Sequence, residues 1–482
     1  MGSLHRPAME HLRLPARLGA AFLGLGTLGF AALNRPALSV LPSRTVQSSS
    51  PSLDALIVGG GPSLQYNQFG IESNVRYVTS LIPQGGMKRV LFADGSKKTR
   101  DVQYLSPSGN VLYRAPRLKQ IDGPSTIASF DAALSAILGL ASTQTGSHTP
   151  ADRLDDSRGS MPSEASPGES IGDGSPIAAP AGRPLLLYFT GHGGPDESGD
   201  YLENDYGLWK NGSLTVSDLR TRLDRVPADR PTVLVMVQCF SGAFGDLVFR
   251  GKREPPPSSP KGSSPAVAEP PETRPLRENF CGFFASVAER EAAGCTPEVN
   301  EAEYHDFTSY FFAALSGHDR VGRAVSGADY NADGRVGMDE AFAYTMIHDI
   351  SIDTPVSTSD AFLRSVVTRS NDDIFKTRYT DVRKWASPCQ AAVLKQIGEK
   401  LKLSGDSAVS RSYYIMARRL RSEDEEDSEN ESQTALWVRF VRTAKTVILE
   451  HELMAGDDSQ RKAQLSRLLA SEAESLPLIT RK

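Results

Sequence analysis

The sequence contains no run of basic residues and almost no excess of charge of either sign. Its formal net charge is −5 over 482 residues. A nucleic-acid-binding surface needs clustered Lys and Arg, so this balance gives no reason to expect a nucleic-acid partner. The hydrophobic content of 39% is typical of a soluble globular protein, and the length indicates two or three domains.

Long hydrophobic runs are also scarce, and residues 18–33 form the one that stands out. Basic residues precede this run, and the small-residue stretch 37–39 follows it. This order is typical of a signal peptide, which we predict over residues 1–39, so the mature protein is expected to be secreted or periplasmic. The run is short for a spanning helix and is diluted by Gly and Ala, which leaves an uncleaved membrane anchor as the alternative. Residues 40–52, rich in Ser and Pro, are predicted to be a linker.

Cysteine is rare, with Cys239, Cys281, Cys295 and Cys389 as the only four. Export would permit a disulfide, and Cys281 with Cys295 is one candidate pair. The spacing alone does not choose among the possible connectivities. If one of the four cysteines is a nucleophile, at most one disulfide can form within the chain.

Short apolar runs alternate with helical patterns through the first part of the chain. Such alternation predicts an α/β domain with a mostly parallel sheet that is covered on both faces. The expected helices lie near residues 69–81, 127–140, 216–223 and 307–315, and the expected strands near 54–58, 88–93, 184–189, 232–237 and 282–287.

Two stretches with little to bury interrupt this domain, which we place at residues 53–382. Residues 142–182 and 254–275 are rich in Ser, Gly and Pro and are predicted to be mobile insertions without a fixed fold. Residues 383–482 are predicted to form a helical C-terminal region, within which the acidic run 423–427 is expected to be a solvated loop.

Two potentially reactive side chains follow the ends of two predicted strands. His192 follows the strand at 184–189, and Cys239 follows the strand at 232–237. Parallel strands deliver such residues to one edge of the sheet, where an imidazole can serve a thiol as base and acid. Glycines such as Gly193 permit close approach of a peptide, and backbone amides there can stabilise an oxyanion. Taken singly, each residue has an ordinary alternative, a buried small hydrophobe for Cys239 and a turn residue for His192.

Both residues stand in short motifs, Gly191-His192-Gly193 and Gln238-Cys239-Phe240-Ser241-Gly242, about fifty residues apart. Together the motifs resemble those of the caspase-fold cysteine peptidases. Caspases carry Gln-Ala-Cys-x-Gly at a similar separation from the histidine. Because Gln238 directly precedes the cysteine, the resemblance is to the fold family and not to caspases themselves. It implies a caspase-like three-layer sandwich that cleaves protein or peptide substrates.

The legumain-like branch of that family is the most similar. Legumain-type enzymes carry a Tyr-Asn pair after the first strand, which resembles Tyr66-Asn67, and the resemblance implies that Asn67 orients the catalytic histidine. The family's Arg and Glu that hold the substrate residue before the cleaved bond are replaced by Phe69 and Val237. Asparagine specificity therefore does not carry over. Asp306 falls near the family's acidic pocket residue and would suit a basic substrate side chain.

Residues 329–340 match the twelve-residue calcium loop of an EF-hand. Gly334 permits the sharp turn at position 6, and a helical pattern follows the loop. The predicted ligands are side-chain oxygens and the backbone carbonyl of the residue at position 7, and they come from Asp329, Asn331, Asp333, Arg335 and Glu340. We expect one structural Ca²⁺, which would pin the segment after the fifth strand against the active-site edge. An Asp/Asn/Gly turn that caps a helix is the alternative.

Two other functions fit parts of the sequence. A calcium-stabilised binding or scaffold protein could keep this fold without turnover, but the presence of both His192 and Cys239 favours an enzyme. Residues 59–61 are three glycines that could suggest a phosphate loop. No Gly-Lys-Ser/Thr follows them, so a nucleotide-binding loop is rejected.

Overall fold

The computed structural model describes residues 52–140, 183–199, 201–252, 272–421 and 428–480. The chain divides into two units, residues 1–48 and 49–482, and all described residues belong to the second. The predicted signal peptide, the acidic run and most of the predicted linker and insertions lie outside the described residues. Within the described part of the chain, no helix is long and apolar enough to cross a membrane.

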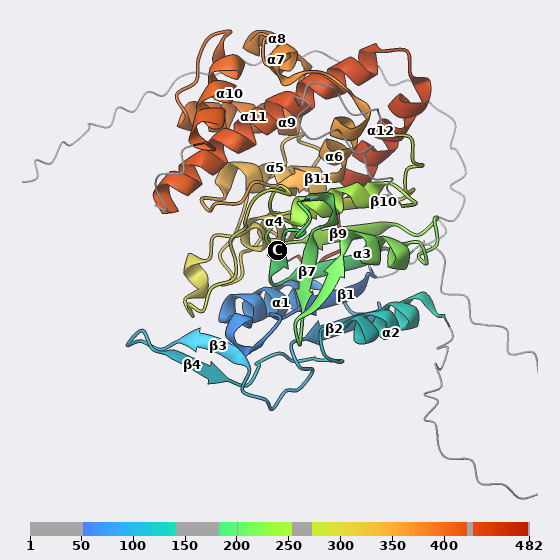
Figure 1. The fold of residues 1–482 in the computed structure, drawn as a ribbon, viewed down its shortest axis with the longest axis vertical. Helices are drawn as coiled ribbons and strands as arrows, with labels where there is room; N and C mark the ends of the chain where they lie inside the picture. Colours follow the sequence, from blue (N-terminus) through green and yellow to red (C-terminus); the bar gives the residue numbers. More distant parts are fainter. Residues whose placement is uncertain (1–51, 141–182, 200, 253–271, 422–427, 481–482) are drawn as a thin grey trace, which may run out of the picture. The chain divides into compact units, whose positions relative to one another are not determined.

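A six-stranded, mostly parallel sheet forms the centre of the second unit, as the sequence predicts (Figure 1). Five strands run parallel, and the last one, β11, is antiparallel to its neighbour β10. All residues of the four inner strands are buried, which explains why the sequence there consists of continuous apolar runs. The spatial order is β11 (Val356–Ser357), β10 (Phe280–Phe284), β9 (Thr232–Met236), β5 (Leu185–Thr190), β1 (Asp54–Gly59) and β2 (Lys88–Phe92).

Helices cover both faces of this sheet. One apolar cluster joins alternate strand residues such as Ile57 and Tyr188 to helices α1 (Phe69–Leu81) and α4 (Phe307–Ser316). The intervening strand residues face the opposite cluster, with helices α2 (Ile127–Leu138) and α3 (Val216–Leu223). The predicted α/β class is therefore confirmed, and the arrangement is compatible with a three-layer fold.

Smaller elements surround the carboxyl ends of the strands. After β1 comes the short helix η1 (Leu64–Tyr66), and after β2 comes the hairpin β3 (Val102–Leu105) and β4 (Val111–Arg114). The helix η3 (Ser241–Val248) follows β9. A three-stranded sheet follows β5 and consists of β6 (Gly193–Gly194), β7 (Asp205–Leu208) and β8 (Gly212–Thr215). The remaining short 3-10 helices are η2 (Tyr201–Glu203) and η4 (Glu301–Glu303).

The predicted fifth strand, residues 282–287, lies two to three residues too far along the chain, since β10 spans Phe280–Phe284. The apolar run misleads because Ala285 and Val287 remain buried beyond the strand's end. The helix α5 (Met338–His348) begins at the end of the predicted calcium loop.

The C-terminal region is helical, as predicted, and it belongs to the same unit as the sheet. Its apolar cluster includes residues of α5, so it packs directly against the α/β part. After the last helix, Leu476 and Leu478 enter the cluster that covers one face of the sheet. The helices that follow β11 are α6 (Thr358–Val366), α7 (Asn371–Ile374), α8 (Tyr379–Trp385), α9 (Pro388–Lys400), α10 (Ala408–Arg419), α11 (Ser428–Ala455) and α12 (Ser459–Glu472).

Candidate active site

The pairing of strands β5 and β9 brings the two predicted catalytic residues to the same edge of the sheet. Phe189 pairs with Met236, and the Val237 amide donates to the Phe189 carbonyl over 3.0 Å. The strands end at Thr190 and Met236, so His192 and Cys239 follow two and three residues later, at the carboxyl edge of the sheet. The chain leaves β1 toward β2 but leaves β5 toward β9, in the opposite direction. The two residues therefore lie beside a switch point of the sheet, where open α/β folds form their binding crevices.

His192 is held by residues of the loop after β1. Its Nε2 lies 2.8 Å from Gln68 Oε1, and its ring makes an edge contact with Tyr66 at a centroid distance of 5.3 Å. Burial lowers the pKa of the His192 imidazole, and a hydrogen bond to the Tyr66 backbone partly opposes this effect. The imidazole is therefore neutral at pH 7.

Asn67 lies next to Gln68, but its side chain makes other contacts. Its Oδ1 accepts a hydrogen bond from the Gly61 amide at 3.3 Å, and its Nδ2 donates to the Asp101 carbonyl at 3.0 Å. Asn67 thus joins the loop after β1 to the start of β3. The side chain that hydrogen-bonds to the imidazole is that of Gln68, one position after the residue predicted for this role.

Cys239 lies half-buried directly after β9. Its Sγ accepts a hydrogen bond from the Ala292 amide at 3.3 Å and lies 3.6 Å from the Ala292 carbonyl oxygen. Burial raises the pKa of the Cys239 thiol to about 11, so the thiol is protonated at neutral pH. Within the described residues, no hydrogen bond joins Cys239 to His192. The imidazole and the thiol are both uncharged in this state.

A segment after β10 crosses the carboxyl edge of the sheet and covers the thiol. We call residues 288–297 the strap. It is fastened at several points, and no residue pattern predicts these contacts because each of them involves a backbone atom. The Ala293 amide donates to Asp353 Oδ1 at 2.6 Å, Cys295 Sγ donates to the Gly191 carbonyl at 3.2 Å, and the Thr296 carbonyl accepts from the Gly70 amide at 2.8 Å.

Gly193 packs directly against the segment that carries the nucleophile. A Cβ built at this position would collide with the Cys239 carbonyl oxygen and would lie 2.6 Å from Gln238 Cγ. A glycine is required for this close approach. The glycine next to His192 therefore allows the His192 and Cys239 loops to touch, as expected for two halves of one site.

Asp306 does not offer a free negative charge to a substrate. Its carboxylate caps helix α4 by accepting from the Ser309 amide at 2.7 Å, and it pairs with Arg320 at 3.1 Å. Only 3% of Asp306 is exposed. The carboxylate is paired with Arg320 and caps α4, so the predicted role of Asp306 in holding a basic side chain finds no support in its contacts.

All four cysteines are unbridged, so the candidate disulfide between Cys281 and Cys295 is not formed. Cys281 Sγ lies 3.7 Å from the Ser471 carbonyl, whereas Cys295 belongs to the strap and contacts Gly191. Burial raises the pKa of both thiols well above the ordinary value. Neither thiol is therefore activated as a second nucleophile.

The predicted calcium loop has the folded backbone of an EF-hand loop. Asp329 Oδ2 accepts from the Gly334 amide at 3.0 Å, and Asn331 Oδ1 accepts from the Asp333 amide at 2.8 Å. Gly334 has a φ of +86°, which the sharp turn requires. The side chains at positions 1, 3 and 5 thus hold the turn closed by accepting hydrogen bonds from backbone amides, and their oxygens are of the type that Ca²⁺ prefers.

Glu340 at position 12 is buried and ties the two ends of the loop together. Its Oε1 accepts from the Tyr330 and Asn331 amides at 2.7 and 2.9 Å, and its Oε2 accepts from the Gly337 amide at 2.9 Å. Among the described residues, no group of three or more His, Cys, Asp and Glu side chains is arranged to hold a metal ion as it stands. As it stands Glu340 caps α5 through the Gly337 amide, which is the contact expected of the helix-capping alternative. The oxygen donors are of the type that Ca²⁺ prefers, and bidentate coordination would require Glu340 to turn from these amides toward the ion.

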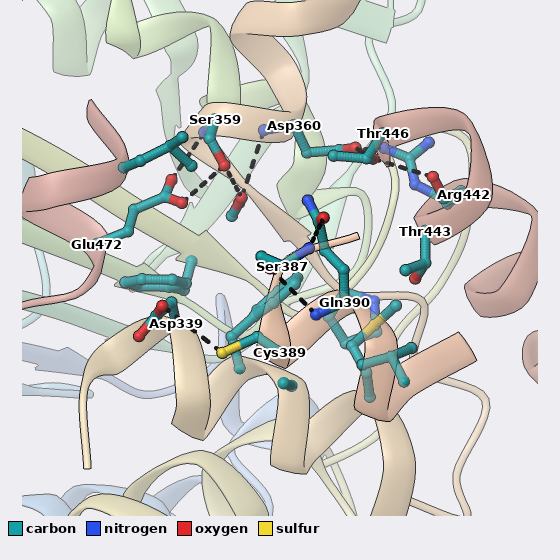
Figure 2. Close-up of a pocket in the computed structure, with 18 residues that line it drawn as sticks. Asp339, Ser359, Asp360, Ser387, Cys389, Gln390, Arg442, Thr443, Thr446 and Glu472 are labelled. Atoms are coloured by element: carbon teal, nitrogen blue, oxygen red, sulfur yellow. Dashed lines mark hydrogen bonds and ion pairs between the residues drawn. The ribbon is translucent and has the colours of Figure 1, made fainter. Parts of the chain in front are cut away.

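A separate cavity of about 110 Å³ lies where the C-terminal helices meet the sheet edge, and it shares no residue with the His192–Cys239 site. Its walls come from β10, β11 and five helices, α5, α6, α9, α11 and α12. Figure 2 shows Asp339 beside Cys389 and Glu472 against Ser359. Cys389 Sγ lies 3.6 Å from Asp339 Oδ2. The Glu472 carboxylate accepts from the Thr358 hydroxyl at 2.8 Å and from the Ser359 amide and hydroxyl at 2.7 Å each.

Stability should fall as the pH rises from about 4.5 to 7 because of Glu472. Burial raises the pKa of Glu472 from 4.5 to about 7, so between these values the folded protein retains a proton that the unfolded chain has lost. The stabilisation is fully present at low pH and is lost once the pH has passed 7, and its size is about 3 kcal/mol. We expect Glu472→Gln to flatten the pH dependence of the denaturation midpoint between about pH 4.5 and 7. The exposed Glu474→Gln is the control, and an unchanged slope in Glu472→Gln would contradict this assignment.

Neither of two comparisons with known proteins finds a relative of this chain. A scan against models of protein families and a search of curated proteins both find no match. The function is therefore inferred from the residues and contacts of this chain.

Proposed function

We propose that this chain is a cysteine endopeptidase of the caspase-like type, closest to the legumain-like branch, with Cys239 as nucleophile and His192 as base. One observation carries the proposal. The neighbouring parallel strands β5 and β9 end just before His192 and Cys239, and Gly193 packs against the Cys239 carbonyl oxygen, beside the switch point between β1 and β5. A thiol and an imidazole at such a crevice are suited to nucleophilic catalysis.

The proposed reaction begins when His192 takes the Cys239 proton and Sγ attacks the substrate carbonyl carbon. The oxyanion that forms would be stabilised by backbone amides, for which the Gly193 loop is the nearest candidate. The imidazolium then donates its proton to the leaving amine, and water hydrolyses the thioester. Gln68 would act as the positioning residue of His192, in the role that the family resemblance gave to Asn67.

Substrate access requires the strap to move, because the Ala292 peptide group occupies the space around Sγ. The present arrangement would therefore be a resting state of the peptidase. A Ca²⁺ bound at residues 329–340 would steady the segment after β10, and an exported protein would meet abundant calcium. Location outside the cytoplasm rests on the predicted signal peptide alone.

The covered thiol also favours a second candidate function. A calcium-binding scaffold protein that keeps the fold without turnover would have no need for an open nucleophile, and burial keeps Cys239 protonated. The two candidates differ in whether a peptide can displace the strap.

A library of peptidyl thiol-reactive probes, applied with and without calcium, separates the two candidates. We expect the protein to be labelled at Cys239, with a yield that depends on the probe residue before the reactive group. Cys239→Ala is the matched control. If folded, calcium-loaded protein is not labelled by any probe, the scaffold function replaces the peptidase.

A further inference from the structure

The calcium loop stands alone in the described part of the chain, although EF-hand loops commonly pair with a second loop. The half of the loop that would face such a partner is residues 336–338, just before and at the start of α5. In this chain that half is covered by the residues that follow α12. We call residues 473–479 the tail.

Backbone and side-chain contacts join the tail to this half of the loop. The Met338 amide donates to the Glu474 carbonyl at 3.0 Å, and the Ser475 hydroxyl donates to the Val336 carbonyl at 2.7 Å. A Cβ built at Gly337 would lie 2.6 Å from the Ala473 carbonyl oxygen, so the loop and the tail are packed as closely as glycine allows. Three consecutive loop residues thus contact three consecutive tail residues.

The tail is also anchored in the α/β core. Leu476 and Leu478 are each 7% exposed and belong to the apolar cluster on one face of the sheet. The Ile479 amide donates to the carbonyl of Leu81, the last residue of α1, at 2.8 Å. The tail therefore connects the calcium loop to the helix that follows the β1 loop.

The same loop residues hold a predicted calcium ligand. The Gly337 amide donates to Glu340 Oε2 while Gly337 lies against the tail. When Ca²⁺ draws Glu340 away from the Gly337 amide, the bond from the Met338 amide to the Glu474 carbonyl remains, so the docked tail holds residues 336–338 in the closed path of the loop. Ordering of the loop and docking of the tail are consequently favoured by the same backbone conformation.

We propose that the tail replaces the missing second EF-hand loop, so that calcium binding at residues 329–340 and docking of residues 473–479 reinforce each other. This inference rests on the calcium site of the proposed function and does not depend on catalysis. The coupling must act in both directions, because the ion and the tail influence each other's equilibrium by one and the same factor.

The first measurement is hydrogen exchange of the tail amides in the full chain, with and without calcium. We expect calcium to slow exchange at the Ile479 amide about tenfold or more. Exchange of the amides of helix α10, which forms no hydrogen bond with the tail in the described part of the chain, should stay unchanged. Equal exchange rates with and without calcium, at concentrations where calorimetry shows the site to be filled, would overturn the coupling.

The second measurement is calcium affinity by titration calorimetry of two tail variants. Leu478→Asp places a charge in the apolar cluster and should undock the tail, raising the Kd for Ca²⁺ about tenfold. Ser475→Ala, which removes only the hydroxyl on Val336, should act in the same direction by about two- to fivefold and covers the case in which Leu478→Asp fails to fold. Ser466→Ala is the control, because its hydroxyl is exposed and bonds only within α12.

The outcomes separate this inference from the function on which it rests. Wild-type affinity in both tail variants, with unchanged tail exchange, would refute the coupling and leave the calcium site standing. A wild-type protein that binds no calcium would refute the calcium site and the coupling together. Probe labelling of Cys239 tests the peptidase independently of both results.

Discussion

Replacement of Arg439 by Met is expected to lower the free energy of unfolding by about 3–5 kcal/mol, the range for breaking a buried charge pair. Arg439 lies on α11 with 1% of its side chain exposed. Its guanidinium donates to the carbonyls of Asp353 at 2.7 Å, Ser351 at 3.2 Å and Met346 at 3.4 Å, as well as to that of Asp349. These carbonyls belong to the end of α5 and the loop that follows it.

The substitution should be severe because methionine fills the volume but donates no hydrogen bond. The carbonyls would be left buried without partners, and Asp349, whose carboxylate lies 3.7 Å from the guanidinium, would lose its counter-charge. Burial already raises the pKa of Asp349, and Arg439 is the largest opposing influence. Its loss should raise that pKa further and drive the carboxyl to the neutral form.

Chemical denaturation at pH 7 measures this effect. Arg418→Met is the matched control, since Arg418 is an exposed arginine of the neighbouring helix α10 and such substitutions change stability by less than about 0.5 kcal/mol. A stability of Arg439→Met within 1 kcal/mol of the wild type would show that the loop after α5 does not depend on the C-terminal helices.

The sequence predicted those elements whose burial is uniform or periodic. Helix α1 spans residues 69–81 and α3 spans residues 216–223, as expected, because their apolar faces repeat at helical spacing. The strand β11 was missed because it has two residues, too few for any pattern. Its antiparallel pairing with β10 depends on the path of the chain after α5, which only the tertiary structure determines.

The candidate site was predictable to the extent that it follows from the sheet. His192 and Cys239 follow strands that pair, so their approach required only the correct strand order. The choice between Asn67 and Gln68 depends on how the short helix η1 turns the chain, and no side-chain pattern reports that turn. Asp306 could have been recognised from sequence, because an Asp before a helix with Ser309 at the third position is a common N-cap.

The strap could not be found from sequence, because a main-chain group at Ala292 makes its contact with the thiol. Every residue offers the same amide and carbonyl, so the contact imposes no residue type at position 292. Asp353, sixty residues away, joins the strap to α4 by accepting from the Ala293 amide at 2.6 Å and from the Phe307 amide at 2.8 Å. Such a connection exists only once α4 and α5 are packed.

Alkylation of Cys239 by iodoacetamide is expected to be about a hundredfold slower at pH 7 than that of an ordinary cysteine, whose pKa is near 8.5. Burial raises the pKa of Cys239 to about 11, and the carboxyl groups of Glu291 and Asp353 act in the same direction. A raised pKa keeps the thiol protonated and unreactive below that value. The rate should therefore rise about tenfold per pH unit from 7 toward 11, the behaviour of a thiolate nucleophile.

Asp353→Ala should accelerate this alkylation at pH 7 at least tenfold. The substitution leaves the Ala293 amide without its acceptor, loosens the strap over Sγ and removes a carboxyl group that disfavours the thiolate. Cys389, which lies in the separate cavity of Figure 2, provides the control within the same sample, since its rate should not change. Peptide mapping by mass spectrometry measures both rates. Rapid alkylation of wild-type Cys239 at pH 7 would mean that the nucleophile is open at rest. An unchanged rate in Asp353→Ala would instead mean that substrate, and not the strap, has to provide the activation of the thiol.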